Sequence, residues 1–355
     1  MKTKNNQVSF IIHPPVEFIY ALHFTANMEE MDKFFLQFNY VQVEDVKQKI
    51  DFMRKKITKY LSSELNYFFK WPEIKHVLGR IATQNQNLSS VHEFITFIEK
   101  IDNKILSSYI LNQNYSDNPK VQELIISMLD KQENEDLRDV ISDTVYKQED
   151  IKEKLLECLE SPEELKLRLC ILLRQFYEKC YLPLEKEILE YLKPFKERYE
   201  KLFEEDNKYF FQEYLRRYSE AKDSNFIINI GYFIQVRPWT FYISPYNNCE
   251  WINIGMYTEQ FPKSYMEKER IKKFLKILSD NKRFEMVELL AKKEWYGLEL
   301  AAELNLTPPT VFYHINSLLD LNLVTFRKDG NKTYYKLNKI KLEELSQGIA
   351  KAILS

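Results

Sequence analysis

The chain has 355 residues, enough for about two or three domains, and its 45% hydrophobic and 29% charged residues indicate a packed protein rather than a disordered one. Its six glycines lie too far apart to form a glycine-rich phosphate loop, which argues against a Rossmann or P-loop nucleotide fold. The net charge is −2, yet residues 268–355 hold 16 basic and 11 acidic side chains, so the remainder is acidic. This asymmetry favours one module that meets an anionic polymer and one that does not.

The N-terminal part reads as mainly helical with a little β structure. Residues 8–12 predict a short strand, and residues 43–220 predict helices almost throughout. Residues 226–236, 240–244 and 250–257 are rich in β-branched and aromatic residues, which predicts a small antiparallel β meander. The expected fold class is mainly α with minor β (α+β), with residues 1–262 as an N-terminal helical and β region and residues 268–355 as a C-terminal domain.

The C-terminal domain carries the pattern of a winged helix-turn-helix. Helices are expected over residues 281–292, 298–304 and 308–320, and Asn305 supplies the residue type that tolerates the left-handed turn between the last two. Thr307 and Pro308 fit the cap and first position of the second helix. Residues 323–327 and 333–337 predict two strands joined by a basic hairpin loop, which is the wing.

Apolar spacing divides the second helix into two faces. The residues expected to point inward are Val311, His314, Ile315 and Leu318. Those expected to point outward are Pro309, Phe312, Tyr313 and Asn316. His314 fits a buried structural histidine better than a base-reading one, and exposed Phe312 and Tyr313 suit apolar contact with thymine methyl groups.

Residues 278–337 resemble the winged-helix domain of the ArsR-type bacterial transcriptional regulators. The recognition-helix pattern is matched by Thr310, Val311, His314 and Leu318, and the wing pattern is matched by Lys328, Gly330, Tyr334 and Tyr335. The resemblance implies a dimeric regulator that reads double-stranded DNA with the second helix and follows the phosphate backbone with the wing. The expected DNA-binding residues are Thr307, Pro309, Thr310, Phe312, Tyr313, Asn316, Arg327, Lys328 and Lys332.

The chain departs from the metal-sensing members of this family. Residues 296–304 hold no cysteine and residues 339–354 hold no histidine, so the family's usual metal ligands are absent and no cofactor or metal is expected. Pro308 and Pro309 also remove backbone donors at the start of the second helix, so phosphate contact should depend more on Arg327, Lys328 and Lys332. Residues 1–262 are expected to sense an unidentified small-molecule or protein effector.

Two apolar stripes predict that the chain forms a homodimer. The first comprises Phe274, Leu275 and Leu278, and the second comprises Leu342, Leu345, Ile349 and Ile353. No apolar run is long enough for a membrane span, and four isolated cysteines are expected to be reduced core thiols, so the protein should be cytoplasmic. No catalytic motif is present, and we expect no enzyme activity. A winged helix that binds proteins, or an N-terminal enzyme joined to a DNA-binding tail, are the alternatives.

Overall fold

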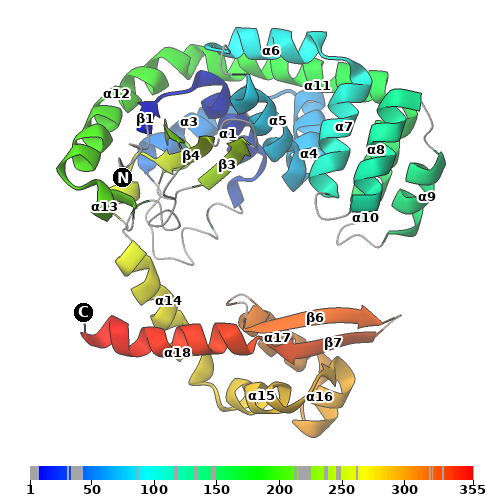
Figure 1. Cartoon of the computed structure of the whole chain (residues 1–355), viewed down its shortest axis with the longest axis vertical. Helices are drawn as coiled ribbons and strands as arrows, with labels where there is room; N and C mark the ends of the chain where they lie inside the picture. Colours follow the sequence, from blue (N-terminus) through cyan, green and yellow to red (C-terminus); the bar gives the residue numbers. More distant parts are fainter. Residues whose placement is uncertain are drawn as a thin grey trace, which may run out of the picture. The chain divides into compact units, whose positions relative to one another are not determined.

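The computed structural model divides the chain into two compact units, residues 1–260 and 261–355 (Figure 1). It describes residues 8–29, 32, 43–85, 88–115, 119–131, 135–144, 149–211, 214, 225–235, 239–244, 249–260, 263–319, 321, 323–329 and 332–354. Among these residues, no helix combines the length and apolar character needed to cross a membrane. The expected fold class, mainly α with minor β, is confirmed.

The first unit is built from helices around one four-stranded sheet. Its strands are β1 Val8–Ile11, β2 Asn225–Gly231, β3 Trp239–Ser244 and β4 Cys249–Gly255. Its helices before the long central segment are α1 Pro14–Ala26, α3 Glu44–Lys56, α4 Lys59–Phe69, α5 Pro72–Gln84, α6 Val91–Lys100, α7 Asn103–Asn114, α8 Pro119–Lys131, α9 Glu135–Asp143 and α10 Glu149–Glu160. The central segment comprises α11 Pro162–Phe176, the π-helical turn Tyr177–Tyr181, α12 Leu182–Glu205 and α13 Asn207–Phe210. A 3₁₀ turn, Thr258–Gln260, follows β4.

The sheet corrects the prediction of an antiparallel meander. Its order is β1-β2-β4-β3, with β1, β2 and β4 parallel and only β3 antiparallel to β4. Strand β4 therefore inserts between β2 and β3, and β1 joins from more than 200 residues away in the sequence. Every residue of β4 is buried, which is typical of parallel strands covered on both faces. Helix α12 packs on β1 and β2, and α5 packs on β3.

Buried asparagines connect the three parallel strands. Asn229 of β2 pairs in register with Asn253 of β4, and its Nδ2 donates to Asn253 Oδ1 at 2.9 Å. The Oδ1 of Asn229 accepts from the backbone N–H of His13 at 2.7 Å, and His13 lies two residues after the end of β1. Both asparagines are completely buried, and these two bonds satisfy both polar atoms of the Asn229 side chain and the Oδ1 of Asn253.

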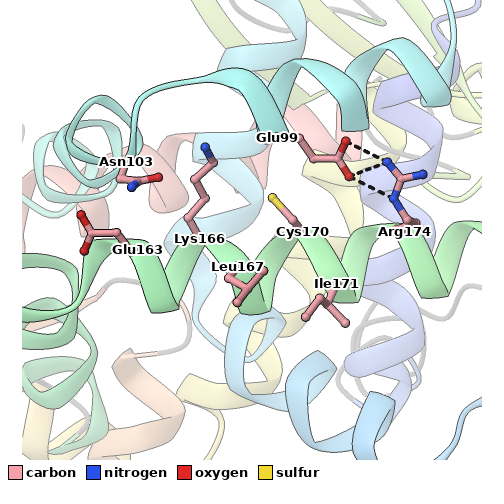
Figure 2. A pocket seen from close by; sticks show the side chains of 8 residues that line it. All are labelled: Glu99, Asn103, Glu163, Lys166, Leu167, Cys170, Ile171 and Arg174. Carbon is pink, nitrogen blue, oxygen red and sulfur yellow. Dashed lines mark hydrogen bonds and ion pairs between the residues drawn. The ribbon is translucent and has the colours of Figure 1, made fainter.

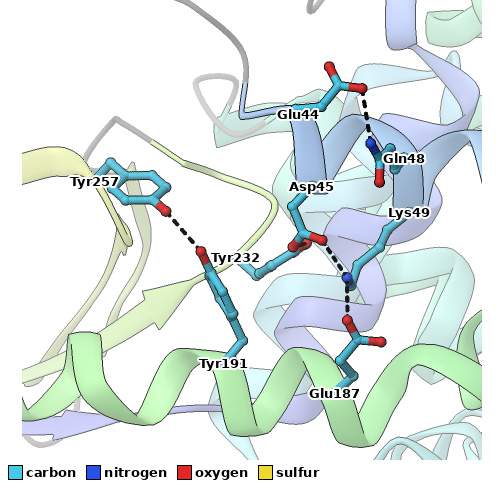
Figure 3. A network of polar contacts seen from close by, with 8 residues as sticks. All are labelled: Glu44, Asp45, Gln48, Lys49, Glu187, Tyr191, Tyr232 and Tyr257. Carbon is cyan, nitrogen blue, oxygen red and sulfur yellow. Dashed lines mark hydrogen bonds and ion pairs between the residues drawn. The ribbon is translucent and has the colours of Figure 1, made fainter.

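A polar network links α3, α12 and the end of β2 (Figure 3). The Nζ of Lys49 lies 2.8 Å from Asp45 Oδ1 and 2.7 Å from Glu187 Oε1. The hydroxyl of Tyr232, which directly follows β2, donates to the other oxygen of Asp45. Only 8% of the Lys49 side chain is exposed, so its ammonium has little contact with water. The charged hydrogen bonds to Asp45 and Glu187 take the place of that water.

The four cysteines, Cys158, Cys170, Cys180 and Cys249, are all buried and free, as expected. Burial raises the pKa of Cys170 and of Cys180 to about 11. Both thiols are therefore protonated near neutral pH, and thiols in that form are poor nucleophiles.

The second unit is the winged helix with one flanking helix at each end. Its elements are α14 Lys263–Leu278, α15 Asn281–Lys292, β5 Trp295–Tyr296, α16 Gly297–Glu303, α17 Pro308–Leu319, β6 Val324–Asp329, β7 Lys332–Leu337 and α18 Lys339–Leu354. Strands β5, β7 and β6 form a three-stranded sheet in that order.

The flanking helices α14 and α18 pack against each other within this unit. Phe274 of α14 and Leu345 of α18 are each 2% exposed, and Leu278, Leu342 and Ile349 pack against the same core, so five of the seven residues of the predicted dimerisation stripes are used inside the chain. A Cβ atom on Gly348 would come within 2.6 Å of Ile271 Cδ1, which shows how closely the two helices approach. Leu275 and Ile353 remain exposed.

Buried titratable groups of the first unit predict how its stability varies with pH. Burial lowers the pKa of His13 and His76 to about 4 and of His23 to about 3, and it raises the pKa of Glu17 to about 8. From pH 6.5 down to 4 these histidines bind protons in the unfolded chain but stay neutral in the folded one. The free energy of unfolding therefore falls as the pH falls. From pH 4.5 up to 8 the unfolded chain releases a proton that folded Glu17 keeps, so stability falls with rising pH.

Three histidines outweigh the carboxyl groups below pH 6.5, and above it Glu17 dominates, with Glu185 and Glu259, whose pKa values burial also raises, acting in the same direction. We expect a stability maximum near pH 6.5, with each group contributing up to roughly 1.4 kcal/mol per pH unit. Urea unfolding followed by tryptophan fluorescence measures this, since Trp71 and Trp251 are buried in this unit. Glu17→Gln should remove most of the fall between pH 6.5 and 8, and an unchanged fall would contradict the assignment to Glu17.

Candidate nucleic-acid interface

A tight turn joins α16 to α17 and fixes how the second helix projects. Asn305 adopts the left-handed conformation (φ 53°) that the sequence predicted, and the N–H of Leu306 donates to the carbonyl of Ala301 at 2.9 Å. Thr307 caps α17: its Oγ1 accepts from the N–H of Thr310 at 3.4 Å and lies 2.7 Å from the Thr310 hydroxyl. The turn and cap together orient α17 against the rest of the unit.

The two faces of α17 are divided as predicted. The inner stripe, Val311, His314, Ile315 and Leu318, is buried in the core of the unit. On the other face Phe312 is 59% exposed and Tyr313 is 65% exposed. Thr307, Pro309 and Asn316 are also exposed, and Thr310 is half-buried. Large aromatic side chains exposed at neighbouring positions form a surface that can contact another molecule.

His314 is a buried histidine next to the cap of another helix. It is 8% exposed, and its Nδ1 lies 4.0 Å from Oδ1 of Asp280. Asp280 caps α15 by accepting from the N–H of Arg283 at 3.0 Å, and this bond is the main reason that its pKa is lowered. His314 therefore lies at the packing contact of α17 with α15, away from the exposed face.

The wing presents one basic face. In the β6–β7 ladder Arg327 pairs with Tyr334 and Thr325 pairs with Lys336, so alternation places these side chains with Lys332 on the same side of the hairpin. Arg327, Lys332 and Lys336 are exposed, and we call these three side chains the basic face of the wing. The side chain of Lys328 and residues 330 and 331 lie outside the described residues.

Aromatic rings and one carboxylate hold the cations of this face. The guanidinium of Arg327 lies 4.6 Å from the ring centroid of Tyr334, and Lys332 Nζ lies 5.6 Å from that of Tyr296. The Nε of Arg327 donates to Oε2 of Glu294 at 2.8 Å. Lys336 Nζ lies 3.8 Å from the other oxygen of Glu294.

Sequence reasoning missed Lys336 and Glu294. Strand alternation could have found Lys336, because it stands two residues after Tyr334 and four after Lys332. No sequence signal could have found Glu294, which lies before β5 and reaches the wing only through the β5–β7 pairing. The hydrogen bond from Arg327 lowers the pKa of Glu294, so the carboxylate stays ionised near neutral pH.

Comparison with known proteins identifies this unit. Residues 280–325 match the family described as bacterial regulatory protein, arsR family. The arsenical resistance operon repressor of Staphylococcus aureus is 39% identical over 84 residues, which are 24% of this chain and 81% of that protein. The chain belongs to the arsR family. A second arsenical resistance operon repressor, from Staphylococcus xylosus, is 37% identical over the same shares of each chain.

The arsR-family match is confined to the C-terminal unit. The cadmium resistance regulatory protein CadC of Listeria innocua is 35% identical over 75 residues, which are 21% of this chain and 63% of that protein. No solved structure matches the chain. Within the part of the chain that the structure describes, no group of three or more histidine, cysteine or acidic side chains is arranged to hold a metal ion.

The first unit contains an open cavity of about 410 Å³ between α6, α7 and α11 (Figure 2). Both cations of its lining already have partners in the protein. Arg174 forms a two-pronged ion pair with Glu99, with its Nε 3.0 Å from Oε1 and one terminal nitrogen 2.8 Å from Oε2. Lys166 Nζ donates to the carbonyl of Ile101 at 2.5 Å. Neither cation of the lining is therefore available to hold an anionic ligand without giving up a contact within the protein.

A pair of substitutions on α17 tests the division of its faces. Ile315→Ala should destabilise the C-terminal unit by about 2–5 kcal/mol, because it removes a completely buried side chain from the core. Phe312→Ala should change stability by no more than about 0.5 kcal/mol, because that ring is largely in solvent. Hydrogen exchange of the α15 and β7 amides measures both effects in the full chain. Equal losses of protection would contradict the faces described.

Proposed function

We propose that the protein is a transcription regulator that binds double-stranded DNA through its C-terminal unit. The exposed face of α17 enters the major groove, and the basic face of the wing lies along the phosphate backbone. One observation carries the proposal. In this arsR-family unit, α17 has an exposed face, and β6 of the wing packs directly against α17. The repressor function of the relatives named above supports it.

The chemistry of each surface suits a different part of DNA. Phe312 and Tyr313 offer apolar surface for thymine methyl groups, and Asn316 offers an amide that can pair with adenine. The start of α17 is the part of the helix that approaches the groove, and it comprises the cap Thr307 with Pro309 and Thr310. Since prolines reduce the number of N–H donors there, the phosphates are held mainly by the wing, where Arg327, Lys332 and the predicted Lys328 supply positive charge.

We further propose that two chains associate through α14 and α18. The residues of the predicted stripes that remain exposed are Leu275, 45% exposed, and Ile353, 72% exposed. Leu354, next to Ile353, is 85% exposed. A two-fold dimer would place two α17 helices about 34–36 Å apart, one turn of DNA, and would favour a near-palindromic site.

The proposed role of residues 1–262 is to sense a non-metal signal and shift the population of chains that bind DNA. This role fits an acidic unit that has its own core and lies outside the family match. It also fits the missing metal ligands on α16 and α18.

The salt dependence of DNA binding tests the wing. Replacing Lys332 and Lys336 with alanine should weaken binding to every sequence and flatten the log–log salt slope by about 0.9 per lost phosphate contact. Fluorescence anisotropy with a mixed-sequence duplex between about 50 and 200 mM salt measures the slope. The matched control replaces Lys55 and Lys70, two exposed cations of the first unit, and should leave the slope nearly unchanged.

The same titration separates regulator from protein-binding module. A wild-type chain that shows no binding at either salt concentration would contradict DNA binding and would favour a protein partner for Phe312 and Tyr313. Wild-type binding with an unchanged slope in the Lys332 and Lys336 variant would instead remove the wing from the interface.

Charge placed on the exposed stripe tests the dimer. Leu275→Glu combined with Ile353→Glu should give monomers in sedimentation equilibrium, because four carboxylates would meet in the proposed interface. Folding should persist, since both side chains are exposed in the single chain. Affinity for a palindromic site should then fall more than affinity for a single half-site. A dimer that survives both substitutions would locate the interface elsewhere.

A further inference from the structure

Glu294 is a carboxylate from outside the hairpin that lies against the basic face of the wing. It lies two residues after the end of α15 and directly before β5, and about a third of its side chain is exposed. One of its oxygens accepts from Arg327 Nε at 2.8 Å, and the other lies 3.8 Å from Lys336 Nζ. A single residue from outside the hairpin thus contacts cations on both strands of the wing.

The position of Glu294 conflicts with simple phosphate binding. A phosphate on the basic face would approach Arg327 and Lys336 while a fixed negative charge already accompanies them, and like charges at short range repel. To bind Arg327 through Nε, the phosphate must take the place of Glu294. The hydrogen bond that Arg327 donates keeps Glu294 ionised, so this negative charge is present throughout the neutral pH range.

Tyr334 gives Arg327 a second support. The guanidinium lies over the Tyr334 ring, and the two residues are partners in the β6–β7 ladder. Arg327 therefore keeps its place on the wing through this stacking when its ion pair with Glu294 opens. Losing Glu294 removes a competitor without releasing the arginine from the surface that presents it.

We propose that Glu294 is a built-in counter-ion that limits how tightly the wing holds DNA phosphate. This inference rests on the proposed DNA binding and adds a regulating residue to it. Because phosphate contacts contribute equally on all sequences, an internal competitor on the wing weakens non-specific binding and leaves the base contacts of α17 unchanged. Discrimination between DNA sequences then depends relatively more on the base contacts of α17.

Glu294→Gln tests this directly in the full chain. It keeps the size of the side chain and removes its charge, and it should tighten binding to a mixed-sequence duplex of about three turns by about two- to fivefold, the size typical of exposed ion pairs. The log–log salt slope should steepen by up to about 0.9, because one more phosphate contact forms without competition. The gain should be the same at pH 6 and pH 8, since Glu294 is ionised at both.

The matched control is Glu288→Gln, which makes the same charge change on the exposed face of α15, with no described ion pair to the wing. It should change the slope far less than Glu294→Gln. In a chain that already carries Arg327→Gln and Lys336→Gln, Glu294→Gln should have little effect, because both of its partners are gone.

The outcomes separate this proposal from the proposed function. If the wild-type chain does not bind the duplex, the DNA-binding function fails. If the wild type binds and Glu294→Gln binds equally or more weakly, DNA binding stands, and Glu294 positions Arg327 instead of opposing phosphate. An effect of equal size in the chain that lacks Arg327 and Lys336 would also overturn the proposal. Thermal unfolding of each variant checks that the exposed substitutions leave the unit folded.

Discussion

The C-terminal unit depends on how the inner stripe of α17 packs into its core. Val311, Ile315 and Leu318 are almost completely buried, and their contacts with α15, α16 and β6 fix the rotation of the helix about its axis. Once that rotation is fixed, Phe312 and Tyr313 have no place inside and must face solvent. The same apolar contacts that stabilise the unit therefore create its exposed aromatic face, and the left-handed turn at Asn305 is the local feature that allows the packing.

Electrostatics on the wing are balanced rather than uniformly positive. A hairpin with Arg327, Lys332 and Lys336 on one side would attract any polyanion, but Glu294 and two tyrosine rings pair with those cations in the folded unit. The rings keep the cations in place without neutralising them, whereas the carboxylate reduces their net charge. The net charge of this face thus depends on three chain segments that meet only after β5 pairs with β7.

The first unit is organised differently, with many helices around a small sheet that is parallel except for β3. Asn229 and Asn253 link β2 to β4, and the backbone of His13 attaches β1 to the same pair. Strand β1 comes from the start of the chain and the other strands from beyond residue 224, so all the helices from α1 to α13 lie in the connection between them. This closure gives the unit a core of its own, consistent with its separation from the arsR-family match.

The sequence by itself determined the winged helix. Apolar periodicity, the Thr307 cap, Asn305 and the two basic strands are local signals, and they were enough for the helix boundaries, the faces of α17 and the family. The sequence also identified the β-rich segments of the first unit, but only the tertiary structure decided that β1, β2 and β4 run parallel, since strand direction depends on contacts between distant segments. It likewise decided that Phe274 and Leu345 pack together inside one chain, and that Glu294 reaches Arg327, because neither contact leaves a periodic trace in the sequence.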